Sequence, residues 1–490
     1  MARSGHAKAI ATMLYSGDLN GAVAACEDTL HGHPNDDEVL ALQGQVLAQL
    51  RRTDEAMASL MKAIRLEPKR PEYTTLLGEL YMNSGRYRDA LVQYDKAIKA
   101  HPLYDPAWAG KASTYLRMGK AEKARKVIQQ RVDSGNISPP IAVLHARVLV
   151  KVGETEAAVD SLQPYLDDIS LPIENQRSIW FALGSAHEKA EQLPAAFEAY
   201  AHANGLIGPR WDAAMQKRLH DLTAARCSAT DLQSCARSEV DGSGMVFIVG
   251  LPRCGSTLTE QILHSHPAAH GIGESELLPI IAARFQRATD EGAPGPMIMK
   301  DLDAAMLSAA ATEYIEKASI NSGEAGRIID KQLGNYLHLG FIEKALPGAR
   351  IIHCRRNPMD LCLSAWTRQF PPGTNAWADG LDSAGELYCM YEQLMDHWGN
   401  TLSIPMLELR YEELVQDTET HSRRIIDFCG LEWDPACLRF WENKRTVLTM
   451  SSDQVRQPIY DSARNRHQAW GDLLEPLADA LGGAKDRYGS

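Results

Sequence analysis

The residue types with the clearest chemistry lie in one segment, residues 246–258, which reads VFIVGLPRCGSTL. A β-branched apolar run enters a Gly/Pro turn, and the hydroxyl residues Ser256 and Thr257 then open an amphipathic stretch. Backbone N–H groups at the start of a helix, together with such hydroxyls, suit an anion. Arg253 adds positive charge within the turn. The pattern predicts a strand, an anion-binding loop and a helix.

The loop differs at one position from the phosphate-binding loop of nucleoside triphosphatases. That loop carries a lysine directly before its Ser/Thr, whereas Gly255 occupies this place here. We therefore expect a phosphate or sulfate ligand, but not the chemistry of a standard ATPase. Cys254 stands next to Arg253 at the predicted helix start, which fits either a thiol of lowered pKa or a small packing residue.

Further polar residues follow the other predicted strands. Short apolar strand candidates separated by helical patterns occur at residues 327–330, 349–354 and 406–411. This alternation predicts a parallel sheet with helices on both faces, where ligands bind at the carboxyl ends of the strands. Lys331, Arg356 and Tyr411 come at or just after these ends. We expect them to line one site with the anion-binding loop.

Size and composition limit the classes of protein that fit. A chain of 490 residues exceeds what one core serves, so we expect two or three domains. The net charge of −12 argues against general nucleic-acid binding. Nine scattered cysteines suggest neither a disulfide framework nor zinc, and His264, His266 and His270 do not match a metal-ligand spacing. Without an apolar signal core or a membrane-length apolar run, we expect a cytoplasmic protein with no metal and no membrane contact.

The first 205 residues repeat with the tetratricopeptide (TPR) period. Pro34, Pro68 and Pro102 are each 34 residues apart. Small and large residues keep the same step, at Gly44, Gly78 and Ala112 and at Leu60, Tyr94 and Ile128. Small residues at helix crossings let helices approach closely, and about six such repeats form a self-supporting solenoid. We expect this array over residues 1–205, a helical connector over 206–242 and a second domain over 243–485.

Three motifs in the second domain carry a family resemblance. They are PRCGSTL at 252–258, RRNPMDLCLSAWTRQF at 355–370 and SSDQVRQPIYDSARNR at 451–466. Together they resemble the sulfotransferase family, whose sulfate donor is 3′-phosphoadenosine 5′-phosphosulfate (PAPS). Within it, the pattern is similar to the protein-tyrosine sulfotransferase branch and its bacterial relatives that carry TPR arrays. The resemblance covers about residues 245–470.

The resemblance implies a set of donor-binding residues. The loop residues Arg253, Cys254, Gly255, Ser256 and Thr257 would hold the 5′-phosphosulfate. Arg356 and Ser364 would grip the 3′-phosphate, with a contact added by Arg368 from one turn along the same helix face. Tyr411 would lie near the nucleotide, and a covering loop would contribute Ser451, Ser452, Gln454 and Arg466. Arg466 replaces the lysine expected at its place, which keeps the charge but changes the hydrogen-bonding geometry.

The resemblance also implies the catalytic roles. Glu274 would take the proton from the acceptor hydroxyl, with Glu276 as its rival. Lys331 would steady the bridging oxygen as charge develops on the leaving phosphate; Lys300 fits this role less well. Ser451 would share that duty, and Ser452 stands next to it. Arg253 belongs to this set as the cation of the loop.

The sequence therefore predicts an all-α TPR solenoid followed by a P-loop-like α/β sulfotransferase domain with a parallel sheet. The expected reaction moves the sulfuryl group of PAPS to an acceptor hydroxyl, and a protein tyrosine presented by the TPR array is one acceptor. A carbohydrate or small-molecule acceptor stays open, as does a homodimer. Two other interpretations remain, a kinase and a TPR scaffold with an inactive nucleotide-binding domain.

Overall fold

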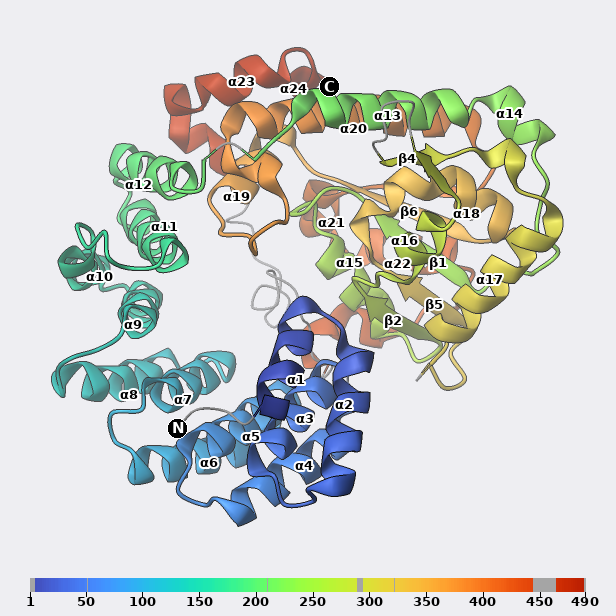
Figure 1. Ribbon diagram of the computed structural model, residues 1–490. Coiled ribbons are helices and arrows are strands. Elements are labelled where there is room, and N and C mark those ends of the chain that lie inside the picture. Colours follow the sequence, from blue (N-terminus) through green and yellow to red (C-terminus); the bar gives the residue numbers. More distant parts are fainter. Residues whose placement is uncertain are drawn as a thin grey trace. The chain divides into compact units, whose positions relative to one another are not determined.

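The computed structural model describes residues 5–50, 52–208, 210–288, 294–320, 322–443 and 464–488 (Figure 1). The chain divides into two compact units, one running from Met1 to Ala199 and the other beginning at Tyr200. The first unit is helical, and the second contains a parallel sheet. The predicted fold class is therefore confirmed.

The first unit is built from helices that pack in consecutive pairs, α3 with α4, α5 with α6, α7 with α8 and α9 with α10. In chain order, the helices up to the boundary between the units are α1 Gly5–Ser16, α2 Leu19–Gly32, α3 Asp37–Gln49, α4 Thr53–Leu66, α5 Pro71–Asn83, α6 Tyr87–Ala100, α7 Asp105–Arg117, α8 Ala121–Asp133, α9 Pro139–Val152, α10 Thr155–Leu162, η1 Gln163–Tyr165, α11 Ile173–Lys189 and α12 Leu193–Gly205. This succession of helix pairs is the arrangement that the 34-residue period predicts.

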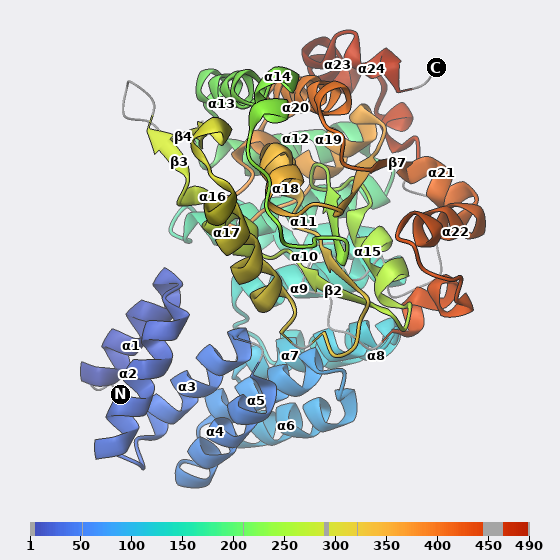
Figure 2. The same cartoon turned by 90° about the vertical axis from the view of Figure 1, so that its right-hand side faces the viewer.

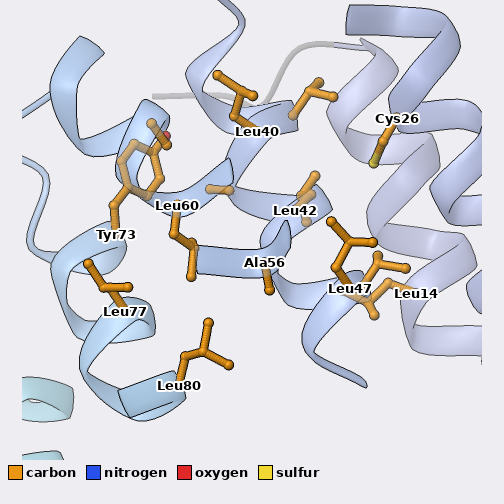
Figure 3. Packing of buried hydrophobic residues seen from close by; sticks show 14 of the residues in the cluster. Leu14, Cys26, Leu40, Leu42, Leu47, Ala56, Leu60, Tyr73, Leu77 and Leu80 are labelled. Carbon is orange, nitrogen blue, oxygen red and sulfur yellow. The ribbon is translucent and has the colours of Figure 1, made fainter. Parts of the chain in front are cut away.

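Small residues let these helices approach one another closely. A Cβ atom on Gly78 would lie 2.8 Å from the Tyr94 ring, and one on Gly110 would lie 2.2 Å from it. At the equivalent place one repeat earlier, a Cβ atom on Gly44 would lie 2.6 Å from Leu60. Figure 3 shows part of the resulting core, in which buried side chains from α1 to α5 form one cluster. The repeated small and large positions are thus the contact points between neighbouring helices.

The second unit is organised around a five-stranded parallel sheet with the strand order β2-β5-β1-β6-β7. Its strands are β1 Met245–Val249, β2 Ala269–Gly273, β5 Arg327–Asp330, β6 Arg350–Arg355 and β7 Met406–Arg410. The central strand β1 is buried along its whole length, which explains its unbroken apolar sequence. A separate antiparallel pair is formed by β3 Gln286–Ala288 and β4 Pro294–Met297.

Helices cover both faces of this sheet. In chain order, the remaining helical elements among the described residues are α13 Ala213–Arg226, α14 Ala229–Ser234, α15 Ser256–His264, α16 Leu277–Ala283, η2 Met299–Asp301, α17 Ala304–Ala318, η3 Leu333–His338, α18 Leu339–Ala345, α19 Pro358–Trp366, η4 Ala376–Asp379, α20 Leu381–Thr401, α21 Tyr411–Gln416, α22 Thr418–Phe428, η5 Pro435–Glu442, η7 Arg466–Leu474, α23 Glu475–Leu481 and α24 Ala484–Arg487. Figure 2 shows α16, α17 and α18 on one side of the sheet and α15 and α22 on the other.

The strand order brings four strand ends together. Strand β1 lies between β5 and β6, and β2 pairs with the far side of β5. Because all five strands are parallel, the loops that follow β1, β2, β5 and β6 leave the same edge of the sheet. That edge carries the loop at 250–255, Glu274, Lys331 and Arg356.

The buried imidazole of His353 predicts that the second unit loses stability in acid. His353 lies on β6, and its Nε2 shares a 2.6 Å hydrogen bond with the Tyr391 hydroxyl. Burial lowers the pKa of His353 from 6.5 to about 3, and the positive charge of Arg355 adds to this shift. Between about pH 6.5 and about 3 the unfolded chain therefore binds more protons than the folded chain. The stability that depends on this group is complete above about pH 6.5 and is lost as the pH falls.

We expect His353→Gln to weaken this dependence on pH. The wild-type free energy of unfolding should fall more steeply between pH 6 and 4, by about 1.4 kcal/mol per pH unit, than that of the variant. Urea titrations followed by tryptophan fluorescence measure this slope. The control is His31→Gln, at an exposed position of α2, which should keep the wild-type slope. Equal slopes for His353→Gln and wild type would assign the acid sensitivity to other groups.

Candidate active site

The loop after β1 adopts a backbone conformation that depends on glycine. Gly255 has a φ of 96° and precedes the first residue of α15. A Cβ atom at this position would lie 2.5 Å from Cδ2 of Tyr411, so the loop packs directly against that ring. Arg253 has a φ of 78°, which is uncommon for a residue with a side chain. Ser256 and Thr257 are buried in the first turn of α15. The loop is thus a tight turn held against Tyr411, and it leads into a helix N-terminus.

Cys254 contributes packing on the protein side of this loop. Its side chain is buried, and Sγ lies 2.8 Å from the place of a Cβ atom on Gly250. The neighbouring thiol of Cys354 has a pKa well above its usual value, because it is hydrogen-bonded with Cys254 and buried. Burial raises the pKa of the Cys254 thiol, but hydrogen bonds with Cys354 and Ser256 outweigh burial, so the net pKa lies below its usual value. Cys254 is therefore both a packing residue and a thiol of lowered pKa.

Two arginines meet next to the loop. Arg253 Nε donates a 3.0 Å hydrogen bond to Ser364 Oγ, and Arg356 Nη1 donates a 3.1 Å hydrogen bond to the carbonyl oxygen of Arg253. The Arg356 guanidinium carbon also lies 4.9 Å from the centre of the Tyr411 ring. Arg356 is only 5% exposed. Two guanidinium groups and a serine hydroxyl so placed form an electropositive site suited to phosphate groups.

The turn that carries Arg356 is fixed by hydrogen bonds from both sides. The side chain of Asn357 caps α19 by accepting from the N–H of Asp360 at 3.2 Å. The N–H of Asn357 donates to Glu412 Oε1 at 3.0 Å, and the Tyr488 hydroxyl donates to Glu412 Oε2 at 2.5 Å. The position of Arg356 is therefore set by residues of α19, α21 and the C-terminal segment.

A second polar cluster lies at the ends of β2 and β5. Lys331 follows β5, and its N–H donates to the Gly273 carbonyl at 3.0 Å. Its Nζ lies 2.6 Å from Glu274 Oε1 and 3.8 Å from Glu260 Oε2. The Lys331 side chain is fully buried, whereas the side chain of Glu274 is 48% exposed. Glu274 therefore presents a carboxylate to an incoming group while it contacts a buried ammonium.

Glu274 and its rival Glu276 differ in their contacts. Glu276 is exposed and accepts a hydrogen bond from the side-chain amide of Gln332. Glu274 contacts Lys331 instead. Lys300 is exposed in η2, whereas Lys331 lies at the end of a central strand pair.

Asp330 supports this cluster from inside the sheet. It accepts hydrogen bonds from the Tyr314 hydroxyl at 2.6 Å and from the Gln332 N–H at 2.8 Å. Burial raises the pKa of Asp330 to about 7. Neither Asp330 nor Glu260 was identified from the sequence as a site residue. The signal for Glu260 was the only carboxylate of the amphipathic stretch 258–263, which forms part of helix α15.

The remaining candidates fall into two groups. Ser451, Ser452 and Gln454 lie within residues 444–463, outside the described residues. Arg368 is described, but the expectation that it continues the helix face of Ser364 is wrong, because α19 ends at Trp366 and Arg368 lies exposed beyond it.

Arg466 lies close to the helix that carries Ser364. Its guanidinium donates to Thr367 Oγ1 at 3.1 Å and 3.2 Å. The adjacent His467 donates its N–H to Asp360 Oδ1 at 2.8 Å. Burial raises the pKa of Asp360, whereas hydrogen bonds from His467 and the positive charge of Arg356 lower it. The lowering effects are larger in sum, so the net pKa lies below its ordinary value. The segment that follows residue 463 is therefore attached to α19.

Two features of the described residues bear on the class of protein. Among them, no group of three or more His, Cys, Asp and Glu side chains is arranged to hold a metal ion. None of the helices described has the length and apolar character needed to cross a membrane.

Residues 245–435 match the model of the sulfotransferase family, and residues 13–80 and 81–147 match that of the tetratricopeptide repeat. An uncharacterized protein of Aquifex aeolicus is 27% identical over 74% of this chain and 48% of its own length. The protein-tyrosine sulfotransferase of Drosophila melanogaster is 23% identical over 48% of this chain and 49% of its own length. Protein-tyrosine sulfotransferase 2 of Gallus gallus is also 23% identical, over 48% of this chain and 66% of its own length. The chain thus spans about half the length of the first two relatives.

Proposed function

We propose that this chain transfers the sulfuryl group of PAPS to the hydroxyl of a protein tyrosine, because residues 245–435 match the model of the sulfotransferase family and protein-tyrosine sulfotransferases are among the relatives. The observation that carries the proposal is the contact of Lys331 with Glu274, at the same sheet edge as the paired arginines Arg253 and Arg356. A carboxylate, a buried ammonium and a phosphate-binding group are the parts that transfer to a hydroxyl needs.

The donor set fits the anionic groups of PAPS. The loop at 250–257 offers backbone N–H groups and hydroxyls for the 5′ end. Arg356 and the hydroxyl of Ser364 offer a fork and a hydrogen-bonding partner for the 3′-phosphate. PAPS supplies the sulfuryl group, and adenosine 3′,5′-bisphosphate (PAP) is the other product.

The residues of the second cluster divide the transfer step between them. Glu274 takes the proton of the acceptor hydroxyl while the oxygen–sulfur bond forms. The bond between sulfur and the bridging oxygen breaks, and its electron pair stays on the phosphate side. Lys331 holds positive charge fixed near that oxygen, so the charge is stabilised as it develops. Ser451 would add a hydrogen bond at the same oxygen.

The acceptor class rests on the two kinds of domain in the chain. Two of the relatives reported above are protein-tyrosine sulfotransferases. A TPR array holds extended peptides or partner proteins, so we propose that it recruits the protein whose tyrosine is sulfated. Sulfation of a carbohydrate or a small molecule is the alternative that the acceptor experiment decides.

Calorimetry with the full chain tests the donor part of the proposal. We expect PAP to bind about ten to a hundred times more tightly than adenosine 5′-monophosphate, because the 3′-phosphate adds charged hydrogen bonds worth about 1.5–3 kcal/mol. ATP should bind weakly. Tight binding of ATP with none of PAP would favour a kinase and contradict the family-based assignment of the donor.

A transfer assay tests the acceptor part. Labelled PAPS is offered with tyrosine peptides, glycans and small phenols, and with Glu274→Ala as the inactive control. We expect label on tyrosine peptides with the wild type only. Label on glycans alone would show that the acceptor is a carbohydrate and not a protein tyrosine. Binding of PAP without transfer to any acceptor would instead favour an inactive nucleotide-binding domain on a TPR scaffold.

A further inference from the structure

Glu260 is a buried carboxylate in α15. It is only 2% exposed, and it lies in the helix that begins at the anion-binding loop. Burial of a carboxylate is costly unless hydrogen bonds or an opposite charge compensate for it. The contacts of Glu260 must therefore compensate for the cost of its burial.

Those contacts join three segments of the site. Glu260 Oε1 accepts a 3.0 Å hydrogen bond from the N–H of Gly273, the residue directly before Glu274. Glu260 Oε2 lies 3.8 Å from Lys331 Nζ. One carboxylate thus fixes the end of β2 and faces the ammonium that follows β5. Lys331 is consequently shared between a buried partner, Glu260, and a half-exposed one, Glu274.

The sharing matters for the charge balance during transfer. If Glu274 were the sole counter-ion of Lys331, protonation of Glu274 would leave a fully buried ammonium uncompensated. The ion pair with Lys331 would also hold the Glu274 carboxylate away from an acceptor. A second carboxylate that never leaves the interior removes both constraints.

We propose that Glu260 is a positioning residue that serves as the permanent counter-ion of Lys331 and so releases Glu274 to act on the acceptor hydroxyl. This role rests on the proposed sulfotransfer, because it concerns the transfer step. The charge pairing itself is testable without any activity.

The first test is a thermal-stability cycle on the full chain. Glu274→Gln should change the melting temperature little, since Glu260 still compensates Lys331. Glu260→Gln keeps an oxygen for the Gly273 N–H, and Glu274 still compensates Lys331. The double variant leaves the buried ammonium without either carboxylate, so its melting temperature should fall by about 6 °C or more beyond the sum of the single effects. Additive shifts would overturn the proposal whether or not the chain is active.

The second test is kinetic and uses a matched control. Glu260→Gln should lower kcat by about ten- to a hundredfold, with little change in KM or PAP affinity. This loss is smaller than the factor of about 10²–10⁴ that a general base itself contributes. In a Lys331→Met background it should have no further effect on kcat. The control Glu343→Gln also alters a buried glutamate that accepts two backbone N–H groups, from Ser403 and Ile404, and lies near a lysine; it should keep wild-type kcat.

The outcomes separate this proposal from the proposed function. An unchanged kcat in Glu260→Gln, or an equal loss of kcat in both Lys331 backgrounds, overturns the positioning role. A wild-type chain that transfers no sulfate overturns the proposed function, and a stability cycle that is not additive would still establish Glu260 as the counter-ion of Lys331.

Discussion

The Lys331→Met variant is expected to lower kcat by about 10²–10³-fold while PAP affinity stays nearly unchanged. Lys331 is fully buried, and its Nζ contacts Glu274 at 2.6 Å, so the charge is held rigidly at the edge of the sheet. A fixed charge that stabilises the transition state more than the ground state contributes to kcat and not to ground-state binding. Steady-state rates at saturating labelled PAPS, together with calorimetry for PAP, measure the two quantities.

A matched control for this variant exists on α17. Lys317 Nζ lies 2.7 Å from Glu313, so Lys317→Met also breaks a close ion pair, but an exposed one. It should keep wild-type kcat. Since Lys331→Met leaves Glu260 buried without that ammonium, its melting temperature must be compared with that of Lys331→Met/Glu260→Gln, in which both charges are removed. A parallel loss of PAP affinity and kcat would make Lys331 a donor-binding residue instead.

The TPR array could be predicted in detail because its repeats encode local contacts. Gly78 and Tyr94 are 16 residues apart and touch within one helix pair, as do Gly44 and Leu60 one repeat earlier. When contact partners recur at a fixed short separation, the sequence itself reports which residues meet. The confirmed all-helical character of this region follows from that regularity.

The strand β2 could not be predicted, and part of the site depends on it. Its five residues, AHGIG, include two glycines, which are poor strand formers. Pairing with β5 places it in the sheet, and that pairing joins residues about 58 positions apart, such as Ala269 and Arg327. The hydrogen bond from Gly273 to Glu260 arises only from this tertiary arrangement. Glu260 was therefore not among the predicted site residues.

For the residues next to the anion-binding loop, the sequence likewise indicated which residues take part but not how they are arranged. The hydrogen bond of Arg253 to Ser364 spans 111 positions, and the family resemblance pointed to both residues without giving their geometry. The expectation for Arg368 failed because it assumed that a helix continues for another half turn. The backbone ends α19 at Trp366, with Thr367 as the C-cap. The last turn of a helix is set by such capping contacts, which residue spacing does not report.

Replacement of Arg356 is expected to reduce the affinity for PAP far more than the affinity for adenosine 5′-monophosphate. Arg356 follows β6, is buried against Tyr411 and lies beside the Arg253–Ser364 pair. If it binds the 3′-phosphate, Arg356→Ala should weaken PAP binding by about ten- to a hundredfold, the value of a charged hydrogen bond. Arg356→Lys keeps the charge but loses the planar fork and the stacking on Tyr411, so we expect an intermediate loss.

The comparison of two nucleotides distinguishes binding from a purely structural role. Arg356 Nη1 also supports the loop through the carbonyl oxygen of Arg253. If this support were its whole function, Arg356→Ala would weaken both nucleotides equally, because both use the loop for the 5′-phosphate. Calorimetry with PAP and adenosine 5′-monophosphate on wild type, Arg356→Lys and Arg356→Ala gives the ratio of the two nucleotide affinities for each protein. A ratio that stays at its wild-type value in both variants would contradict the assignment of Arg356 to the 3′-phosphate, whereas a ratio that falls towards one would support it.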